Sequence, residues 1–377
     1  MNKKLLAVAV GTALAGSVGI AQADVQLFGQ LDTSIDSHDC QTNCNGYSAY
    51  QGYTKSDGSK KLNMNSNFSY FGIKGAEDMG NGIKAIFNAT FSYNTVGHAV
   101  GGTFNSYGSN SISDNEKWLG LSGDFGAVRA GTVTTPYSDH GAMLDPFYGT
   151  SLEANKGGLQ SLGLHDEYRA GQFANGLSER TLRYDSPDMN GLSGSAFYTM
   201  GRSSNKYGNK HNPYGLGVQY KNGNILAFAD WLTSAQGSDV RNKDKAFDFG
   251  GRYAMGNIGM FAMYERGGLV YPVSSATVSG VTTTTYSGMS SNQWHLGGDF
   301  TMGNTMLYAA YGRGTESNVN VPSTGAVTNQ TVKHRAWTLG AKHNLSARTS
   351  VYAGWNSLNR DGDGHSDHFG VGMNLKF

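Results

Sequence analysis

The sequence predicts an all-β fold, a 16-stranded antiparallel transmembrane β-barrel, on three observations. Apolar and polar residues alternate with a period of two along most of the chain after residue 24. The alternating stretches number sixteen, and bacterial barrels have an even number of strands. Short turns and long polar connections alternate along the chain. The turns should therefore lie at one end of the strands and the long loops at the other.

The alternation is clearest at the C-terminus. Every second residue from Phe369 to Phe377 is apolar, and the residues between them are Gly, Asn or Lys. In a strand these two sets point to opposite faces, whereas a helix would scatter them. The same pattern predicts strands at 24–36, 66–76, 83–95, 117–123, 127–135, 179–185, 192–200, 213–220, 225–233, 246–254, 258–266, 292–301, 305–313, 334–343, 349–357 and 367–377.

The connections are of two kinds. Pairs such as Asn222 and Gly223, or Gly256 and Asn257, supply the positive φ that tight hairpin turns need. Four other connections are long and polar, and they cover 37–61, 97–115, 268–289 and 315–332. These four are expected to be loops at the opposite end of the barrel.

A soluble β-sandwich would also show alternation and is the alternative architecture. The strand number, the one-ended loops and the polar faces rich in Gly, Lys, Arg and Asp favour a barrel, which in lipid must close to pair its edges. No apolar run of about 18 residues follows the N-terminal segment, which excludes a helical membrane protein. Aromatic residues near the expected strand ends fit interfacial girdles: Tyr93, Trp118, Tyr184, Trp231 and Trp337.

The first 23 residues have the pattern of a cleaved signal peptide. Lys3 and Lys4 precede an apolar stretch, and an Ala-Gln-Ala cleavage site ends at Ala23. A single barrel domain is then expected over 24–377. Export to an oxidising compartment favours a disulfide between Cys40 and Cys44, and an incomplete metal site of two thiolates is the alternative.

Three segments resemble a known family. SYFGIKGAEDMGNG begins at Ser69, GLSGDFGAVRAG begins at Gly120, and DVQLFGQLDTSID begins at Asp24. With the terminal Phe377, they are similar to the general porins of Gram-negative bacteria, of the neisserial and β-proteobacterial type. The resemblance implies a homotrimer in the outer membrane, in contact with its lipid and lipopolysaccharide, that passes ions and small hydrophilic solutes by passive diffusion. It also implies that Phe377 is the assembly signal read by the barrel-assembly machinery.

In that family the third long loop folds into the lumen and forms a constriction. The matching segment is 136–175, whose charges are five carboxylates against two cations, giving −3. The loop candidates for the constriction are Asp139, Asp145 and Glu153. Tyr70 stands where the family often has Arg. Anion selectivity therefore does not follow from the resemblance.

Strand parity turns five cationic side chains of the wall toward the lumen: Lys74, Lys84, Arg129, Arg183 and Arg252. An acidic loop facing a basic wall would set up a transverse field across a narrow pore. The alternative is that these charges only solvate a water-filled lumen.

Motifs for enzymatic chemistry are absent from the sequence, including G-x-S-x-G, H-E-x-x-H and the P-loop. We therefore expect no enzyme, cofactor or metal, with a barrel enzyme, an adhesin and a substrate-specific channel as alternatives. The net charge of +1 gives no basic excess for nucleic acid. Asp361 to Asp367 spaces its oxygens as calcium loops do but lacks the distal Glu, so a solvated turn is favoured.

Overall fold

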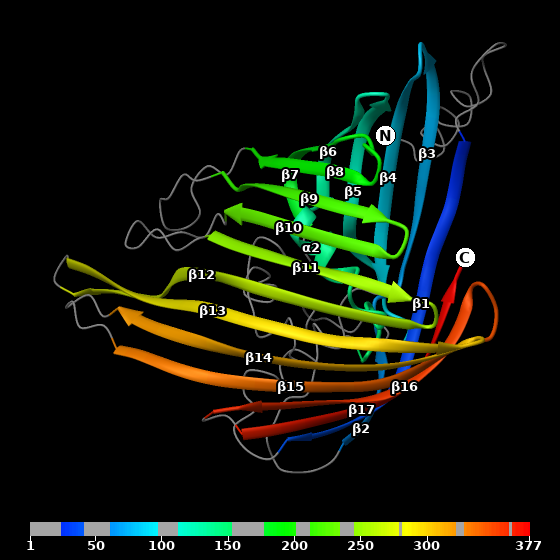
Figure 1. The fold of residues 1–377 in the computed structure, drawn as a ribbon. Helices are drawn as coiled ribbons and strands as arrows, with labels where there is room; N and C mark the ends of the chain where they lie inside the picture. Colours follow the sequence, from blue (N-terminus) through cyan, green and yellow to red (C-terminus); the bar gives the residue numbers. More distant parts are fainter. Residues whose placement is uncertain are drawn as a thin grey trace, which may run out of the picture.

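The computed structural model describes residues 24–40, 61–96, 112–152, 177–200, 212–233, 245–278, 281–321, 328–361 and 364–377. These residues form seventeen strands and the short helix α2 (Figure 1). Their bounds are β1 Asp24–Cys40, β2 Lys61–Ser66, β3 Tyr70–Gly80, β4 Ile83–Tyr93, β5 Ile112–Gly123, β6 Gly126–Thr134, α2 Pro136–Ala142, β7 Leu177–Asp185, β8 Leu192–Thr199, β9 Tyr214–Asn222, β10 Ile225–Thr233, β11 Lys245–Met255, β12 Ile258–Val278, β13 Val281–Met302, β14 Thr305–Val321, β15 Thr328–Asn344, β16 Thr349–Arg360 and β17 Gly364–Lys376.

The strands close into one antiparallel ring. Each strand from β3 to β17 pairs with the next one along the chain, and β1 pairs with β17. β2 and β3 both pair with β1 and are two parts of one strand, interrupted at residues 67–69. The barrel therefore has sixteen strand positions, and the predicted fold class is confirmed.

The outer face of this barrel is apolar, and its inner face carries many polar side chains beside a buried apolar cluster that includes Phe147, Phe261 and Tyr308. On β17, Phe369, Val371 and Met373 are about half exposed, whereas His368 and Asn374 are buried. On β15, His334 and Thr338 are buried beside Ala336, and on β10, Asp230 is buried between Phe228 and Leu232. A soluble protein buries its apolar face. The inversion is the pattern of strands whose outer face meets lipid.

The first and last strands meet at a seam. Gly29 donates its N–H to the Phe377 carbonyl oxygen at 3.0 Å, and Phe377 donates to the Gly29 carbonyl oxygen at 3.1 Å. The Phe377 ring also covers Gly29, because a Cβ on Gly29 would lie 2.5 Å from that ring. In Figure 1 the C-terminal end of the chain lies beside β1. The seam thus needs both the terminal aromatic side chain and a residue without one.

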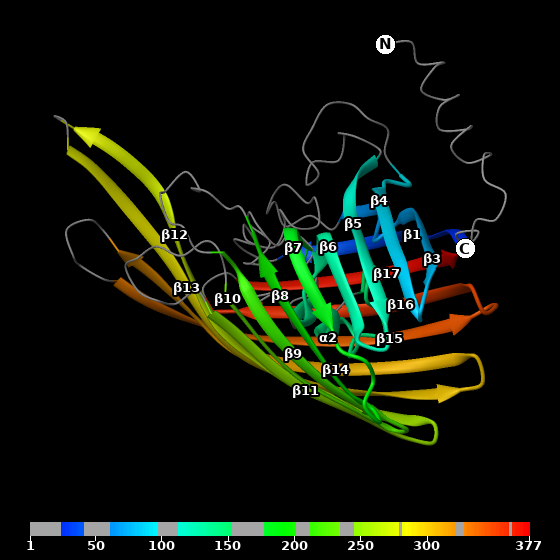
Figure 2. The same cartoon turned by 90° about the horizontal axis from the view of Figure 1, so that it is seen from above.

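Two of the predicted loops are largely strand. β12 and β13 have 21 and 22 residues and pair up to Val278 opposite Val281, so most of 268–289 is a long hairpin. β14 and β15 likewise extend into 315–332. Crossing a bilayer takes about 9–11 residues of tilted strand, so these four strands reach beyond it (Figure 2). The prediction failed because their extensions are polar and carry no clear alternation.

Among the described residues, no helix has both the length and the apolar character to cross a membrane.

Candidate functional site

The segment 136–152 follows β6 and lies against the inner face of the barrel. Thr135 caps α2 by accepting the Ser138 N–H at 3.3 Å, and Pro136 occupies the first helical position. α2 contacts β9, β10 and β11, and it lies within the curve of the sheet in Figure 2. The chain thus crosses from β6 to strands that come much later in the sequence.

Residues 144–152 follow α2 and contact β14, β15 and β16 on the inner face of the barrel. Phe147 is fully buried, with its ring centroid 5.5 Å from that of Tyr308 and 6.3 Å from that of Tyr352. Gly340 leaves room for it, since a Cβ there would lie 2.6 Å from the Phe147 ring. Burying a phenylalanine stabilises by about 1.5–3 kcal/mol. Backbone contacts add to this: the Phe68 N–H donates to the Gly149 carbonyl oxygen at 3.0 Å.

One predicted wall cation meets one predicted loop anion. Arg183 on β7 donates from Nη1 to Asp139 Oδ2 on α2 at 2.6 Å and to the Thr134 carbonyl oxygen at 2.7 Å. Its Nη2 lies 2.8 Å from Asp185 Oδ1. Arg183 is buried, so its charge depends on these partners rather than on water. It fastens the start of α2 to the wall.

Arg129 pairs with wall carboxylates and with no loop carboxylate among its described contacts. Its guanidinium binds Asp185, with Nε 3.1 Å from Oδ2, and its Nη1 lies 4.0 Å from Glu116 Oε1. It also lies over the Trp118 ring, 5.2 Å from the centroid. Trp118 in turn donates to Glu116 Oε1 at 2.9 Å. Placing Trp118 in an interfacial girdle was therefore wrong, because its parity turns it inward.

A different arrangement holds the other side of α2. His140 Nδ1 lies 2.9 and 2.8 Å from the two carboxylate oxygens of Asp230 on β10. Asp230, Asp248 and Glu265 are directly opposed in the register of β10, β11 and β12, and all three are buried. The carboxyl groups of Asp230 and Asp248 therefore lie on neighbouring strands at directly opposite positions. We call these three residues the acidic row.

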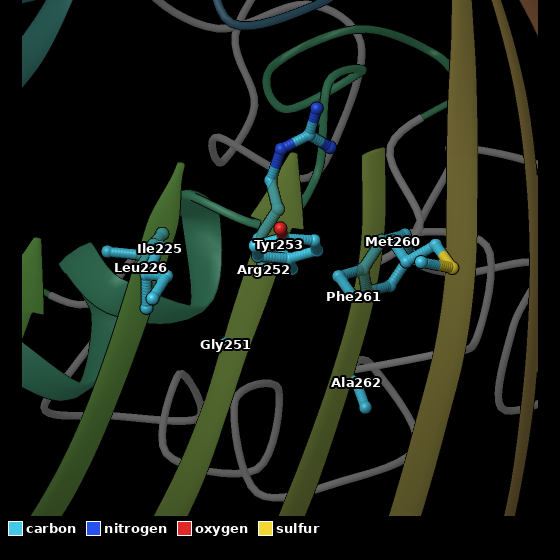
Figure 3. Close-up of a pocket in the computed structure, with 8 residues that line it drawn as sticks. All are labelled: Ile225, Leu226, Gly251, Arg252, Tyr253, Met260, Phe261 and Ala262. Carbon is cyan, nitrogen blue, oxygen red and sulfur yellow. The ribbon is translucent and has the colours of Figure 1, made fainter. Parts of the chain in front are cut away.

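The other predicted wall residues lie apart from the described loop residues. Arg252 pairs with Asp299 on β13, with Nη2 3.0 Å from Oδ2, in a shallow groove formed by β10, β11 and β12 (Figure 3). Lys74 lies over the Phe28 ring, 4.9 Å from its centroid. Lys84 is exposed beside the short turn between β3 and β4. The wall cations therefore do not form one basic face toward the loop.

The remaining sequence candidates are placed as follows. Asp145 is buried and accepts the Phe147 N–H at 2.9 Å, which shapes the turn before Phe147. Glu153 lies outside the described residues, as does Cys44. Cys40 is described only as the end of β1. The disulfide and the role of Glu153 stay predictions.

Several carboxylates of the inner face were not predicted, because only cationic residues of the strands were considered. Asp185, Asp230, Asp248, Glu265 and Asp299 all occupy inward parity on their strands. Counting acidic residues at inward positions would have found them. Their pairing with particular partners depends on the register across strands.

Within the described ranges, no group of three or more His, Cys, Asp or Glu side chains could hold a metal ion. In the segment with calcium-loop spacing, 362–363 lie outside these ranges. Asp367 binds two neighbouring side chains. His365 Nε2 lies 2.8 Å from its Oδ2, and Trp355 donates from Nε1 to its Oδ1 at 3.1 Å.

Comparison with known proteins decides the family. The family model that matches residues 6–363 describes a Gram-negative porin. The chain belongs to the Gram-negative porin family. This porin is 26% identical, over its whole length and that of the relative, to an outer membrane porin protein of Bordetella pertussis. The family and the closed barrel place it in the bacterial outer membrane.

Two further likenesses agree with this assignment. The porin is 26% identical over 254 residues to the major outer membrane protein P.IA of a serogroup A Neisseria meningitidis, an alignment that covers 64% of this chain and 56% of the relative. The chain thus spans little more than half the length of that curated relative. An anion-selective porin from Comamonas acidovorans matches with a TM-score of 0.66 at 19% identity, covering 94% of this chain and 100% of the other. That likeness concerns the fold.

Proposed function

We propose that this porin is an outer-membrane channel for the passive diffusion of ions and small hydrophilic solutes. The observation that carries the proposal is a closed ring whose outer face is apolar and whose inner face carries many polar and ionisable side chains. Such an interior holds water, and ionisable side chains are cheap there. The absence of an enzymatic motif agrees with this role.

The loop at 136–175 is the constriction of this channel in our proposal. Its support is the course of 136–152 across the lumen from β6 to Tyr308 and Tyr352. A segment on that path narrows the cross-section available to solutes. The charges at the narrowing would be those of Arg129, Arg183, Asp139 and their partners. They number two cations against three carboxylates, Glu116, Asp139 and Asp185.

We also propose a homotrimer that contacts outer-membrane lipid and lipopolysaccharide, with a cleaved signal peptide at 1–23. The sequence resemblance supports the trimer. Planar-bilayer recording of the purified protein tests the channel and the trimer together. We expect stepwise conductance increments in multiples of three, without saturable block by one solute. A protein that inserts but does not conduct would contradict the channel, and a saturable block would indicate a substrate-specific pore.

Phe377 is proposed as the assembly signal for the barrel-assembly machinery. The contact of its ring with Gly29 adds a structural reason for its requirement. Deleting Phe377 should reduce insertion in cells more than it reduces refolding of the purified chain in detergent. Replacing Phe377 by Tyr should restore both. Equal levels of folded protein in cells with and without Phe377 would overturn the assignment.

A further inference from the structure

A group of cations lies on the outer face of the barrel, on strands β12, β14 and β15. These strands are neighbours in the sheet, with β13 between β12 and β14 (Figure 1). We call the group the outer basic patch. Its members are exposed and have outward parity on their strands: Arg266, Arg313, Lys333 and Arg335. Cations on this face are directed toward the membrane and its headgroups, not toward the lumen.

The outer basic patch lies where the strands leave the bilayer. Counted from the short turns, Arg266 and Arg313 are each the ninth residue of their strands, and crossing a bilayer takes about 9–11 residues. Three outward aromatic rings adjoin the patch. The centroids of Trp294 and Tyr311 are 5.6 Å apart, and those of Tyr311 and Trp337 are 4.3 Å apart. Since such rings lie at headgroup level, the cations lie there too.

The charges of the patch are not balanced within the protein. Arg313 and Arg335 are directly opposite each other on neighbouring strands, and Lys333 lies two residues along from Arg335. Like charges at directly opposite positions destabilise a sheet. In the described part of the chain, no ion pair involves a member of the patch, whereas Arg183 and Arg252 on the inner face each pair with an aspartate. An anion from outside the chain would relieve the repulsion.

Arg266 widens the patch across β13. It is directly opposite Asn292, which is opposite Thr315, which in turn is opposite Lys333. Two polar side chains thus stand between two cations that are three strands apart, roughly 14 Å at about 4.8 Å per strand. A surface of this width fits a headgroup that carries more than one phosphate.

We propose that the outer basic patch binds the phosphate groups of lipopolysaccharide, the phosphorylated glycolipid of the outer leaflet. The inference rests on the lipopolysaccharide contact proposed above and names its site. Arginine binds phosphate through paired, charge-assisted hydrogen bonds, and basic clusters beside membrane spans recognise anionic headgroups. The patch lies at the end of the long loops, which is the extracellular end of outer-membrane barrels. It therefore faces the glycolipid leaflet.

The surface below the patch fits the rest of such a lipid. Toward the short turns, the outward positions next to the aromatic rings are apolar and exposed: Leu296, Leu307 and Leu339. Acyl chains would lie along these leucines while the phosphates meet the cations. Apolar contact and charge would then act on two parts of one molecule.

Titration of the refolded protein with diphosphoryl lipid A in a non-ionic detergent tests the site. Calorimetry should show saturable binding that weakens between about 0.1 M and 1 M NaCl, because salt screens exposed charges. The double variant Arg313→Gln with Arg335→Gln should bind at least about tenfold more weakly, since it loses charge-assisted hydrogen bonds to phosphate. Lys333→Gln should weaken binding less, and it serves if the double variant does not fold.

Lys221→Gln with Arg348→Gln is the matched control. It also removes two exposed cations, but near the short turns at the other end of the barrel. It should bind lipid A as the unchanged protein does. Absence of saturable binding in the unchanged protein would overturn the proposal. Equal affinity in the two double variants would also overturn it, by placing the lipid elsewhere.

Two further probes distinguish the source of the phosphate. Millimolar inorganic phosphate should not displace lipid A, and phosphatidylglycerol should bind more weakly than lipid A. Displacement by phosphate, or equal affinity for phosphatidylglycerol, would overturn the assignment to the glycolipid. Planar-bilayer conductance of the same samples reports on the channel separately. The variants of the patch should conduct as the unchanged protein does, so loss of the lipid site and failure of the proposed channel would give different results.

Discussion

The helix α2 is held on its two sides by opposite electrostatic arrangements. Toward β6 and β7, Arg129 and Arg183 face Glu116, Asp139 and Asp185, so nearly every charge has an opposite neighbour. Toward β10, β11 and β12, His140 faces the acidic row, where like groups are adjacent. The first side is stabilised by ion pairs. The second places three carboxyl groups at adjacent register positions, where like charges destabilise. The same kind of residue, an inward Asp, should therefore have opposite effects on stability in the two regions.

The largest effect should come from Arg183→Leu. This change leaves Asp139 and Asp185 partly buried without their shared cation, and we expect a loss of about 3 kcal/mol after allowing for their partial exposure. Denaturant unfolding of the refolded protein, followed by tryptophan fluorescence, measures it. The double variant Arg183→Leu with Asp139→Asn should recover part of the loss. A stability equal to that of the unchanged protein would mean that α2 does not depend on this pair.

A matched pair of isosteric changes then tests the comparison itself. Asp185→Asn removes the carboxylate between Arg129 and Arg183 and should cost about 1–3 kcal/mol. Asp248→Asn removes one of the adjacent carboxyl groups and supplies N–H donors to its carboxyl neighbours. It should leave stability unchanged or raise it by up to about 1 kcal/mol. The same unfolding assay measures both. Equal losses in the two variants would show that the two sides do not differ as described.

Ion preference should change less than stability. Arg129→Glu places a third carboxylate beside Asp185 and Glu116 and should shift the zero-current potential under a KCl gradient toward cations. Lys84→Glu makes the same charge change at the exposed end of a hairpin and should shift it less. Both shifts should shrink at high salt, since the screening length falls from about 10 Å at 0.1 M to about 3 Å at 1 M. A larger shift for Lys84→Glu would place the selective region at that end of the barrel.

The smallest effect is expected from Cys40→Ser, which lies outside both regions. A disulfide between Cys40 and Cys44 would close a very small ring, whose entropic contribution lies toward the low end of about 0–5 kcal/mol. The thermal midpoint of the folded protein should barely move. A large drop would show that the segment after β1 is tied to the barrel more firmly than its sequence indicates.

The strands were predictable because their pattern is local. All sixteen predicted stretches overlap observed strand positions. Alternation of apolar and polar residues marks the lipid-facing side of a strand, and turn residues mark the hairpins. The break at 67–69 was not predictable. It depends on Asn67 donating to Asp32 Oδ1 at 2.6 Å and to the Tyr352 hydroxyl at 3.1 Å, and Tyr352 is distant in sequence.

The candidate site was predictable only in part. Parity placed Arg129 and Arg183 on the inner face, but it could not say which carboxylates they would meet. Arg183 reaches Asp139 because α2 begins immediately after β6, whereas Arg129 is satisfied by Asp185 one strand away. Asp36 Oδ1 lies 3.2 Å from His368 Nε2, a contact that joins the first strand to the last. No local pattern encodes such a meeting.

The contact between Gly29 and Phe377 also sets an order of events. β1 pairs with β17 from Gln30 opposite Lys376 to Cys40 opposite Ser366, so the ring cannot close until the last strand has arrived. Until then, β1 and β16 or β17 present unpaired edges that would pair with any strand nearby. The chain must therefore be kept apart from its neighbours for the whole time of its export.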